Sequence, residues 1–119
     1  MKQIKYAFCL LITAIACDDI IEVEDISDNT VNILAPTNGT VLDTLTTTFT
    51  WEALESAEHY YLQVATPSFE NANQIVADTL LVKTSFSKLL PVNSYEWRIR
   101  AENSDYNTNY TQQSFSIEE

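Results

Sequence analysis

Glycine, histidine and cysteine are scarce in this chain of 119 residues, which contains 1 Gly, 1 His and 2 Cys. A single glycine, Gly39, excludes the glycine-rich loops that bind phosphate groups. With His59 as the only histidine, the usual spacings of zinc ligands are missing as well. We therefore expect the protein to bind no metal ion and no cofactor.

Basic residues are also few. The chain carries 6 Lys and Arg against 17 Asp and Glu, which gives a formal net charge of −11. Such a surface repels the phosphates of nucleic acids and the headgroups of anionic lipids. Nucleic acid is therefore excluded as an electrostatic partner, and the acidity itself speaks for solubility rather than for a particular fold.

No hydrophobic run is long enough to cross a membrane. The longest, from Tyr6 to Ile15, has about ten residues, whereas a spanning helix needs about twenty. It follows a short basic segment with Lys2 and Lys5 and precedes small residues, which is the arrangement of a secretory signal peptide. Residues 1–16 are therefore predicted to be a signal peptide.

The end of this segment resembles a known export motif. Ala14-Ile15-Ala16-Cys17 is similar to the lipobox of bacterial lipoproteins, in which a small residue precedes an invariant cysteine, although Leu is commoner where Ala14 stands. The resemblance implies that cleavage falls before Cys17, that its thiol receives diacylglycerol and that the new amine is acylated. Two or three acyl chains anchor a protein stably, so a membrane is the expected partner through Cys17. The alternative is a secreted protein, cut near Ala16, with a free cysteine.

Residues 17–29 are predicted to be an acidic tether. Six acids and no base occur between Asp18 and Asn29, with only scattered Ile and Val, which is typical of a solvated, self-repelling linker. Acids directly after a lipidated cysteine resemble a surface-export signal of one group of Gram-negative bacteria. That resemblance implies an outer-membrane lipoprotein that faces the cell surface. In other bacteria, an aspartate at this place instead implies retention at the inner membrane.

Alternation of apolar and polar residues dominates residues 30–119 and indicates half-buried strands. In the stretch TLTTTFTWE, for example, Leu45, Thr47, Phe49 and Trp51 share one face. No segment of ten or more residues in this range keeps a helical period. We expect an all-β sandwich of two sheets, with seven strands near residues 31–35, 45–51, 59–65, 74–77, 80–86, 95–101 and 115–117.

One stretch of this domain resembles a known family. Leu89-x-Pro91-x-Asn93-x-Tyr95-x-Trp97 is similar to the pattern that leads into the sixth strand of fibronectin type III domains, with Asn93 in place of the usual threonine. The resemblance covers residues 30–117 and implies a seven-stranded, immunoglobulin-like sandwich. It also implies that the Tyr95 hydroxyl bonds to the backbone a few residues upstream, an arrangement called the tyrosine corner. The inward positions predict an aromatic core of Phe49, Trp51, Tyr60, Phe86, Trp97 and Phe115.

The sequence gives no sign of catalysis. The serines lack a Gly-x-Ser-x-Gly turn with a nearby base, and His59 has no orienting motif around it. Carboxylate pairs such as Glu55 and Glu58 arise by chance among 17 acids. The chain is therefore predicted not to be an enzyme.

Binding is the more promising kind of function. Tyr61, Phe69, Tyr106 and Tyr110 are aromatic residues that the strand pattern does not bury, and the last two occupy the polar stretch NSDYNTNYT. Aromatic rings beside amides and carboxylates anchor protein partners or stack on sugars. Tyr61, Tyr106 and Tyr110 are therefore candidate ligand contacts. The plain structural alternative is that these rings cover the end of the sandwich.

Together these features predict a bacterial lipoprotein with one fibronectin type III-like domain, which acts as an interaction or scaffold module in an outer-membrane assembly. Its expected partner is a protein. The alternative is a glycan-binding accessory lipoprotein of a polysaccharide-uptake system, and a third interpretation is a passive structural unit. Two Asp-Thr-Leu triplets, which contain Thr44 and Thr79, resemble an O-glycosylation pattern of the same bacteria.

Overall fold

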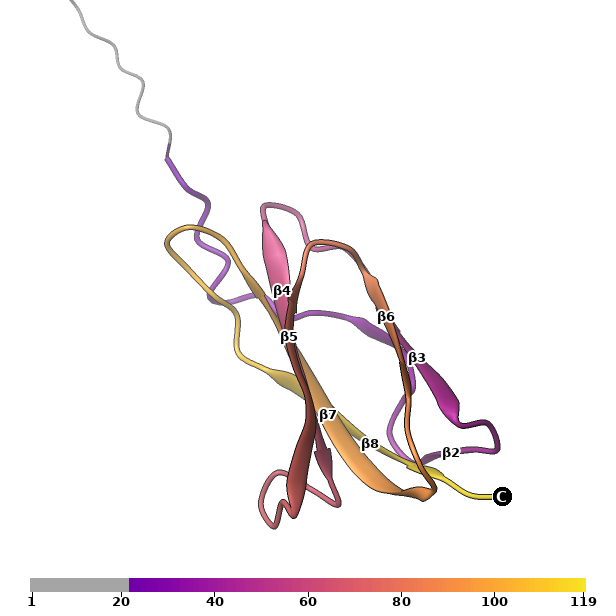
Figure 1. Cartoon of the computed structure of the whole chain (residues 1–119). Coiled ribbons are helices and arrows are strands. Elements are labelled where there is room, and N and C mark those ends of the chain that lie inside the picture. The colour runs from indigo at the N-terminus through magenta and orange to yellow at the C-terminus, as the bar shows by residue number, and fades with distance from the viewer. Residues whose placement is uncertain (1–21) are drawn as a thin grey trace, which may run out of the picture.

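The computed structural model describes residues 22–119, which form eight β-strands and no helix (Figure 1). This described part accordingly contains no helix long and apolar enough to span a membrane. The strands are β1 (Ile33–Ala35), β2 (Thr40–Leu42), β3 (Thr46–Trp51), β4 (His59–Thr66), β5 (Gln74–Leu81), β6 (Ser85–Leu89), β7 (Asn93–Glu102) and β8 (Thr111–Ile117).

The strands form two sheets. One has three strands in the order β1-β3-β6, and the other has five in the order β2-β8-β7-β4-β5. The sheets form the two layers visible in Figure 1, and alternate side chains of each strand meet between them. The predicted all-β, immunoglobulin-like sandwich is therefore confirmed, with eight strands in place of seven.

The additional strand arises because the first strand of the sandwich is divided between the two sheets. β1 pairs antiparallel with β3, the chain turns at residues 36–39, and β2 then pairs parallel with β8. The Asn38 side-chain oxygen accepts hydrogen bonds from the Ser114 N–H at 2.8 Å and from the Ser114 hydroxyl at 3.0 Å. Gly39 supplies the positive φ of 82° in this turn. A strand as short as β2 has too few residues to show an alternating pattern.

The expected strands near residues 74–77 and 80–86 have the wrong bounds. β5 is one continuous strand, because Asp78 and Thr79 pair with β4 and keep the alternation of faces. Two polar residues in succession look like the end of a strand in the sequence, but Asp78 points outward into solvent. The turn lies instead at residues 82–84, and Phe86 belongs to β6.

Aromatic side chains fill the space between the sheets. The ring of Trp97 is fully buried and lies 4.9 Å from that of Phe49, centre to centre, in an edge-on arrangement. Its indole N–H donates to the Pro36 carbonyl at 3.0 Å, which ties the core to the end of β1. Phe86 is half-buried and packs against this core. The expected burial is confirmed for Phe49, Trp51, Tyr60, Trp97 and Phe115.

Leu45 departs from its expected place on the inward face. It is 48% exposed, because β3 begins only at Thr46 and Leu45 lies in the turn before it. Thr47 and Phe49 do lie on the inward face, and Thr48 between them points outward. The Thr48 hydroxyl lies 2.9 Å from the Ser87 hydroxyl of the neighbouring strand β6, on the outer surface of the three-stranded sheet.

Tyr95 forms the tyrosine corner that the family resemblance implies. Its hydroxyl donates to the Pro91 carbonyl at 2.6 Å, and its ring stacks on Phe115 with 5.2 Å between the centres. Burial raises the pKa of the Tyr95 phenol above its ordinary value of 10.0. The hydrogen bond fastens the connection between β6 and β7 to the body of the sandwich.

The last residues of the acidic segment pack against the domain, although the domain was expected to start at residue 30. Ile26 is fully buried in the core, and the Asn103 side chain donates to the Glu24 carbonyl at 2.9 Å. The Asp25 carboxylate accepts hydrogen bonds from the N–H and hydroxyl of Ser27, which lowers the pKa of Asp25. Among the acids, Ile26 looks like part of a solvated linker, but the chain turns it inward.

Candidate ligand-binding surface

The outer face of the five-stranded sheet carries a row of polar and aromatic side chains from three neighbouring strands. In the register of β4 and β7, Tyr61 lies opposite Arg100 and Gln63 lies opposite Arg98. On the other side of β7, Gln112 of β8 also lies opposite Arg98. Directly opposed residues on one face are close enough for their side chains to interact. The register therefore gathers these groups at the middle of the sheet.

Five of these side chains form what we call the arginine–aromatic ladder: Phe69, Arg98, Tyr110, Arg100 and Tyr61. The guanidinium carbon of Arg98 lies 4.2 Å from the ring centre of Phe69 and 4.4 Å from that of Tyr110. The same carbon of Arg100 lies 4.9 Å from the ring centre of Tyr110 and 5.6 Å from that of Tyr61. These distances are typical of cation–π contacts, and each such contact contributes about 0.5–1 kcal/mol at an exposed site.

The two arginines differ in how their charge is compensated. Arg100 forms a salt bridge with Glu102 at 2.7 Å, and His59 contacts the other oxygen of that carboxylate at 2.9 Å. Arg98 forms no salt bridge within residues 22–119. Its Nε donates to the side-chain oxygen of Gln63 at 2.8 Å. Arg98 is therefore a positioned cation without an acidic partner in the described part of the chain.

The nearest acids along the sheet are bound to other groups. The Glu96 carboxylate accepts the Phe69 N–H at 2.8 Å and the Gln112 amide at 3.3 Å. The Asp78 carboxylate accepts a short hydrogen bond from the Tyr61 hydroxyl. This bond raises the pKa of Tyr61 above its ordinary value, because it holds the phenol proton. Glu96 thus fixes the loop that carries Phe69, and Asp78 fixes the ring of Tyr61.

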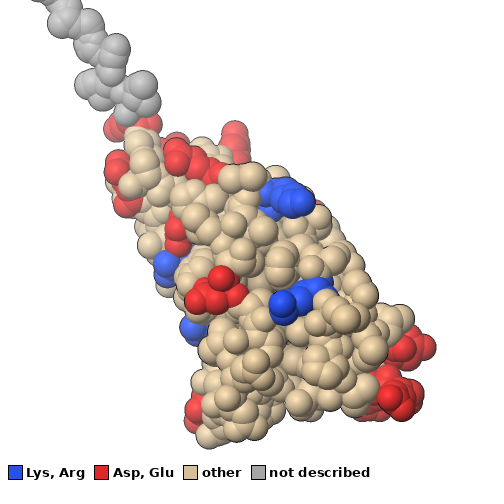
Figure 2. Space-filling model, in the orientation of Figure 1, with Lys and Arg blue, Asp and Glu red and all other residues tan. Residues whose placement is uncertain are grey.

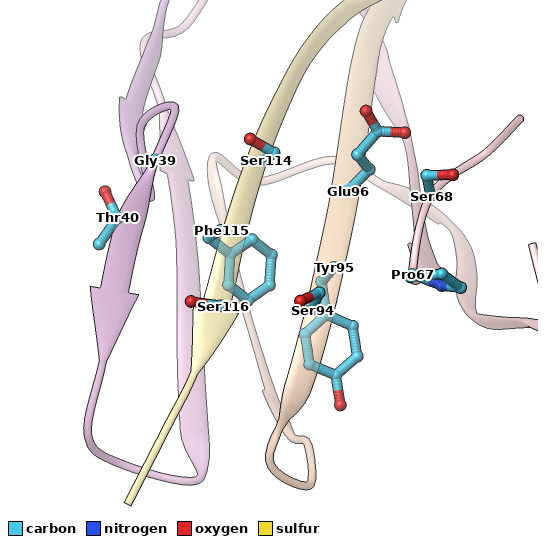
Figure 3. A pocket seen from close by; sticks show the side chains of 10 residues that line it. All are labelled: Gly39, Thr40, Pro67, Ser68, Ser94, Tyr95, Glu96, Ser114, Phe115 and Ser116. Atoms are coloured by element: carbon cyan, nitrogen blue, oxygen red, sulfur yellow. The ribbon is translucent and has the colours of Figure 1, made fainter. Parts of the chain in front are cut away.

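A shallow hollow of about 290 Å³ adjoins the ladder on the same face (Figure 3). Side-chain oxygens of β2, β7, β8 and the loop after β4 line it, from Thr40, Ser68, Ser94, Glu96, Ser114 and Ser116. His59 lies opposite Glu102 at the far end of β7, about 20 Å from Glu96 at 3.3 Å per strand residue. A general base must lie within hydrogen-bond reach of its nucleophile, so His59 activates none of these hydroxyls.

Apart from the ladder, the charged residues between 22 and 119 are mostly acidic. Figure 2 shows a surface on which acidic side chains outnumber basic ones. No three His, Cys, Asp or Glu residues between 22 and 119 are placed to hold a metal ion. Apart from the two ladder arginines, the basic residues of this range are Lys83 and Lys88. The ladder thus holds half of the basic residues of the described domain.

Comparison with known proteins identifies the fold. No family model and no curated protein sequence matches the chain, but solved structures do. The fibronectin type III domain derived from the human KIAA0970 protein matches with a TM-score of 0.56 at 15% identity, over 77% of this chain and 74% of that one. A Fn3-like protein from Clostridium thermocellum matches with a TM-score of 0.55 at 16% identity, over 78% of this chain and 96% of that one. The domain has the fibronectin type III fold.

A third structure, of the fibronectin(III)-like modules of Clostridium thermocellum CbhA, matches with a TM-score of 0.54 at 11% identity. It covers 74% of this chain and 95% of that one. The fold expected from the Tyr95 motif is therefore confirmed. Identities this low show the fold alone, and the activity of this domain depends on its own surface residues.

The structure brings two of the three candidate ligand contacts together. Tyr61 and Tyr110 both belong to the ladder, whereas Tyr106 lies apart in the loop after β7, where its N–H donates to the Asn103 side chain at 2.9 Å. Because Asn103 also binds the Glu24 carbonyl, Tyr106 lies at the end of the domain where the chain enters. The separation of Tyr106 from the ladder follows from the loop geometry, which the sequence does not show.

Arg98, Arg100 and Phe69 are the members of the ladder that the sequence did not mark as ligand contacts. The alternation of β7 places both arginines outward, so their shared face was predictable. Their aromatic neighbours were not, because Phe69 comes from the loop between β4 and β5 and Tyr110 from the residue before β8. A signal was available in the outward Tyr61 and Gln63 of β4, once β4 and β7 are known to be neighbours.

The two threonines of the Asp-Thr-Leu triplets differ in access. Thr44 is exposed in the turn between β2 and β3, and its hydroxyl donates to the Thr46 carbonyl at 3.0 Å. Thr79 is half-buried and lies opposite Leu62, a core residue. Of the two, Thr44 is the more accessible to a modifying enzyme.

Proposed function

We propose that this chain is a non-enzymatic, lipid-anchored protein of a bacterial cell envelope, in which one fibronectin type III domain binds a protein partner within an outer-membrane assembly. The lipid anchor would be Cys17, which lies outside the described residues and rests on its resemblance to a lipobox. The observation that carries the interaction role is the arginine–aromatic ladder on the outer face of the five-stranded sheet.

The composition of the ladder supports a protein interface. Tyr and Arg are enriched among the residues that dominate the energy of protein–protein binding, because each offers a large contact area together with hydrogen-bonding groups. Tyr61, Arg98, Arg100 and Tyr110 are all half-buried rather than fully covered. Gln63, Asp78 and Glu102 hold Arg98, Tyr61 and Arg100 respectively, so these three side chains have little entropy left to lose on binding.

Glycan binding is the second candidate, and the hydroxyl-lined hollow beside the ladder favours it. Ser94, Ser114 and Ser116 could bond to sugar hydroxyls, and Ser68, the neighbour of Phe69 in the chain, lines the same hollow. Against it, Arg98 and Arg100 lie over the rings of the ladder. A sugar that stacks on an aromatic ring would compete with these guanidinium groups for the ring face. Protein binding is therefore the better supported function.

The packing of Ile26 limits the distance and the orientation of the domain relative to a membrane. Since Ile26 is buried in the core, only the stretch from Cys17 to Ile26 remains as a spacer, which reaches about 30 Å when fully extended. The chain enters the sandwich beside Asn103, so the end with Tyr106 would face the membrane. The C-terminus lies at the opposite end (Figure 1) and would face away from it.

Metabolic labelling with an alkyne analogue of palmitate tests the anchor. The wild-type protein and Cys9→Ser should incorporate the label, and Cys17→Ser should not, because Cys9 lies within the predicted signal peptide. Protease treatment of whole cells tests the orientation and should release the domain. Label in Cys17→Ser would contradict the anchor, and complete protection from protease would contradict the surface location.

Affinity capture from crosslinked envelopes tests the interaction role. The partner recovered with the wild-type protein should be lost with the double variant Tyr61→Ala, Tyr110→Ala. A matched control is Thr48→Ala, because Thr48 lies on the outer face of the other sheet. Equal recovery with all three proteins would contradict the ladder as the interface. Binding of the wild type alone on a glycan array would favour the second candidate.

A further inference from the structure

We infer that Arg98 is the receptor for a single carboxylate, an Asp or Glu side chain or a C-terminus, presented by the protein that binds the ladder. This inference rests on the proposed interaction role of the ladder and adds the chemistry of the partner. The two arginines of the sheet differ: Arg100 has an acidic partner in Glu102, and Arg98 has none within residues 22–119.

The surroundings of Arg98 fix its guanidinium group in position. Phe69 and Tyr110 contact it through their rings, at 4.2 Å and 4.4 Å from its central carbon, and Gln63 accepts its Nε–H at 2.8 Å. This is the only side-chain hydrogen bond of Arg98 within the described residues, so its terminal Nη groups are available to a ligand. A planar guanidinium offers two parallel N–H groups to a carboxylate, which binds them in a bidentate manner.

Arg98 has no salt-bridge partner within residues 22–119, although the chain is strongly acidic. The protein has 17 Asp and Glu, yet the acids along this face are held by other groups: Glu96 by the Phe69 backbone, and Asp78 by the Tyr61 hydroxyl. The same contacts build the ladder around Arg98. Within residues 22–119 the sheet thus holds a fixed cation without a salt-bridge partner, among Tyr and Arg side chains.

The neighbouring acids also limit the kind of ligand. Asp78, Glu96 and Glu102 surround the ladder on the same outer face, so each further negative charge of a polyanion would meet a carboxylate. A polymer of uronic acids or a nucleic acid is therefore disfavoured. One carboxylate within an otherwise neutral or basic peptide segment satisfies Arg98 and complements the acids around it.

An NMR titration of the full chain, kept in detergent micelles, tests this inference. The probes are the peptide acetyl-Lys-Glu-Lys-amide and its neutral counterpart acetyl-Lys-Gln-Lys-amide. The Arg98 Nε–Hε signal should shift saturably with the Glu peptide, and the Gln peptide should bind about tenfold more weakly, since it loses the charge-assisted pair. Equal shifts with both peptides would overturn the inference.

Two variants complete the design. Arg98→Lys keeps the charge but loses the bidentate geometry, so it should weaken binding of the Glu peptide. Lys83→Gln removes a cation from the exposed turn between β5 and β6, outside the ladder, so it should leave that binding within about twofold. A loss in Lys83→Gln as large as that in Arg98→Lys would show that the overall charge of the protein, and not Arg98, governs the binding. Tighter binding of an oligoglucuronate than of the Glu peptide would replace the protein carboxylate with an acidic glycan.

The envelope capture described above separates this inference from the proposed function. If Tyr61→Ala, Tyr110→Ala abolishes recovery of the partner and Arg98→Lys does not reduce it, the ladder is the interface and the carboxylate assignment is wrong. If neither protein changes recovery, the proposed function fails together with the inference. Loss of recovery in the double variant and in Arg98→Lys would support both the ladder as the interface and the carboxylate as the ligand of Arg98.

Discussion

Replacing Trp97 by alanine should remove a large part of the stability of this domain. Trp97 is fully buried, its ring packs edge-on against Phe49 at 4.9 Å, and its N–H donates to the Pro36 carbonyl at 3.0 Å. Loss of a buried Trp ring costs about 3–5 kcal/mol. Because Pro36 is itself buried, its carbonyl would lose its partner away from water, which adds to the cost. We expect a loss of about 4–5 kcal/mol in the free energy of unfolding.

Urea denaturation followed by circular dichroism measures this loss. With a slope of about 1.5 kcal/mol per molar urea, the midpoint of Trp97→Ala should fall by about 3 M. The variant Trp97→Phe keeps most of the ring but loses the N–H donor, so its midpoint should fall by about 1 M. Val82→Ala is the control, since Val82 is 82% exposed, and it should change the free energy by less than about 0.5 kcal/mol.

The two Trp97 variants separate the contribution of ring packing from that of the indole N–H. A domain of this kind holds about 5–15 kcal/mol, so Trp97→Ala should remove between about a third and nearly all of its free energy of unfolding. If Trp97→Ala unfolded within about 1 M of the wild type, Trp97 would not occupy the centre of the core. If Trp97→Ala and Trp97→Phe had equal midpoints, the ring packing would carry none of the stability, and the account of the core would be wrong.

Three further predictions concern the edges of the fold. Tyr95→Phe should lower the free energy of unfolding by about 1 kcal/mol. Because burial raises the pKa of Tyr95 in the folded state, the stability that this phenol contributes is complete below about pH 10. That stability is lost as the pH rises through the pKa of the folded state. Urea midpoints between pH 9 and 11 should therefore fall less steeply in Tyr95→Phe than in Tyr106→Phe, and identical slopes would contradict the burial of the phenol. Ile26→Ala should cost about 2–4 kcal/mol and the exposed Glu22→Ala almost nothing in the same assay; equal midpoints would mean that the acidic segment does not pack. Gly39→Ala should cost about 1 kcal/mol, because φ is positive there although no atom lies within 4 Å of an added Cβ, and an unchanged melting temperature would contradict that strain.

Much of the fold could be predicted from the sequence, because period-two alternation reports directly which side chains face the core. Trp51, Tyr60 and Trp97 were predictable for this reason. The division of the first strand was not, because it depends on the Asn38 side chain, which bonds to Ser114 far along the chain. Ile26 was missed because a single apolar residue among acids shows no period.

The candidate site could be predicted only in part. Alternation places Tyr61, Arg98 and Arg100 outward, but an outward residue is the ordinary case and carries no function by itself. What makes the ladder is the neighbourhood of β4, β7 and β8 and the placement of Phe69 by the bond from its N–H to Glu96. Such pairings join residues that lie far apart in the sequence, so local sequence patterns do not predict them.

Site-specific photocrosslinking in living cells that produce the protein is the most direct test of the ladder as an interaction surface. A photoreactive amino acid at Gln112, beside the ladder on β8, should give one discrete adduct with a protein partner, and the adduct should disappear when Tyr110→Ala is added. The same amino acid at Thr48, on the outer face of the other sheet, should give none. Adducts of equal yield from both positions, or from Thr48 alone, would contradict the assignment of the ladder as the interaction surface.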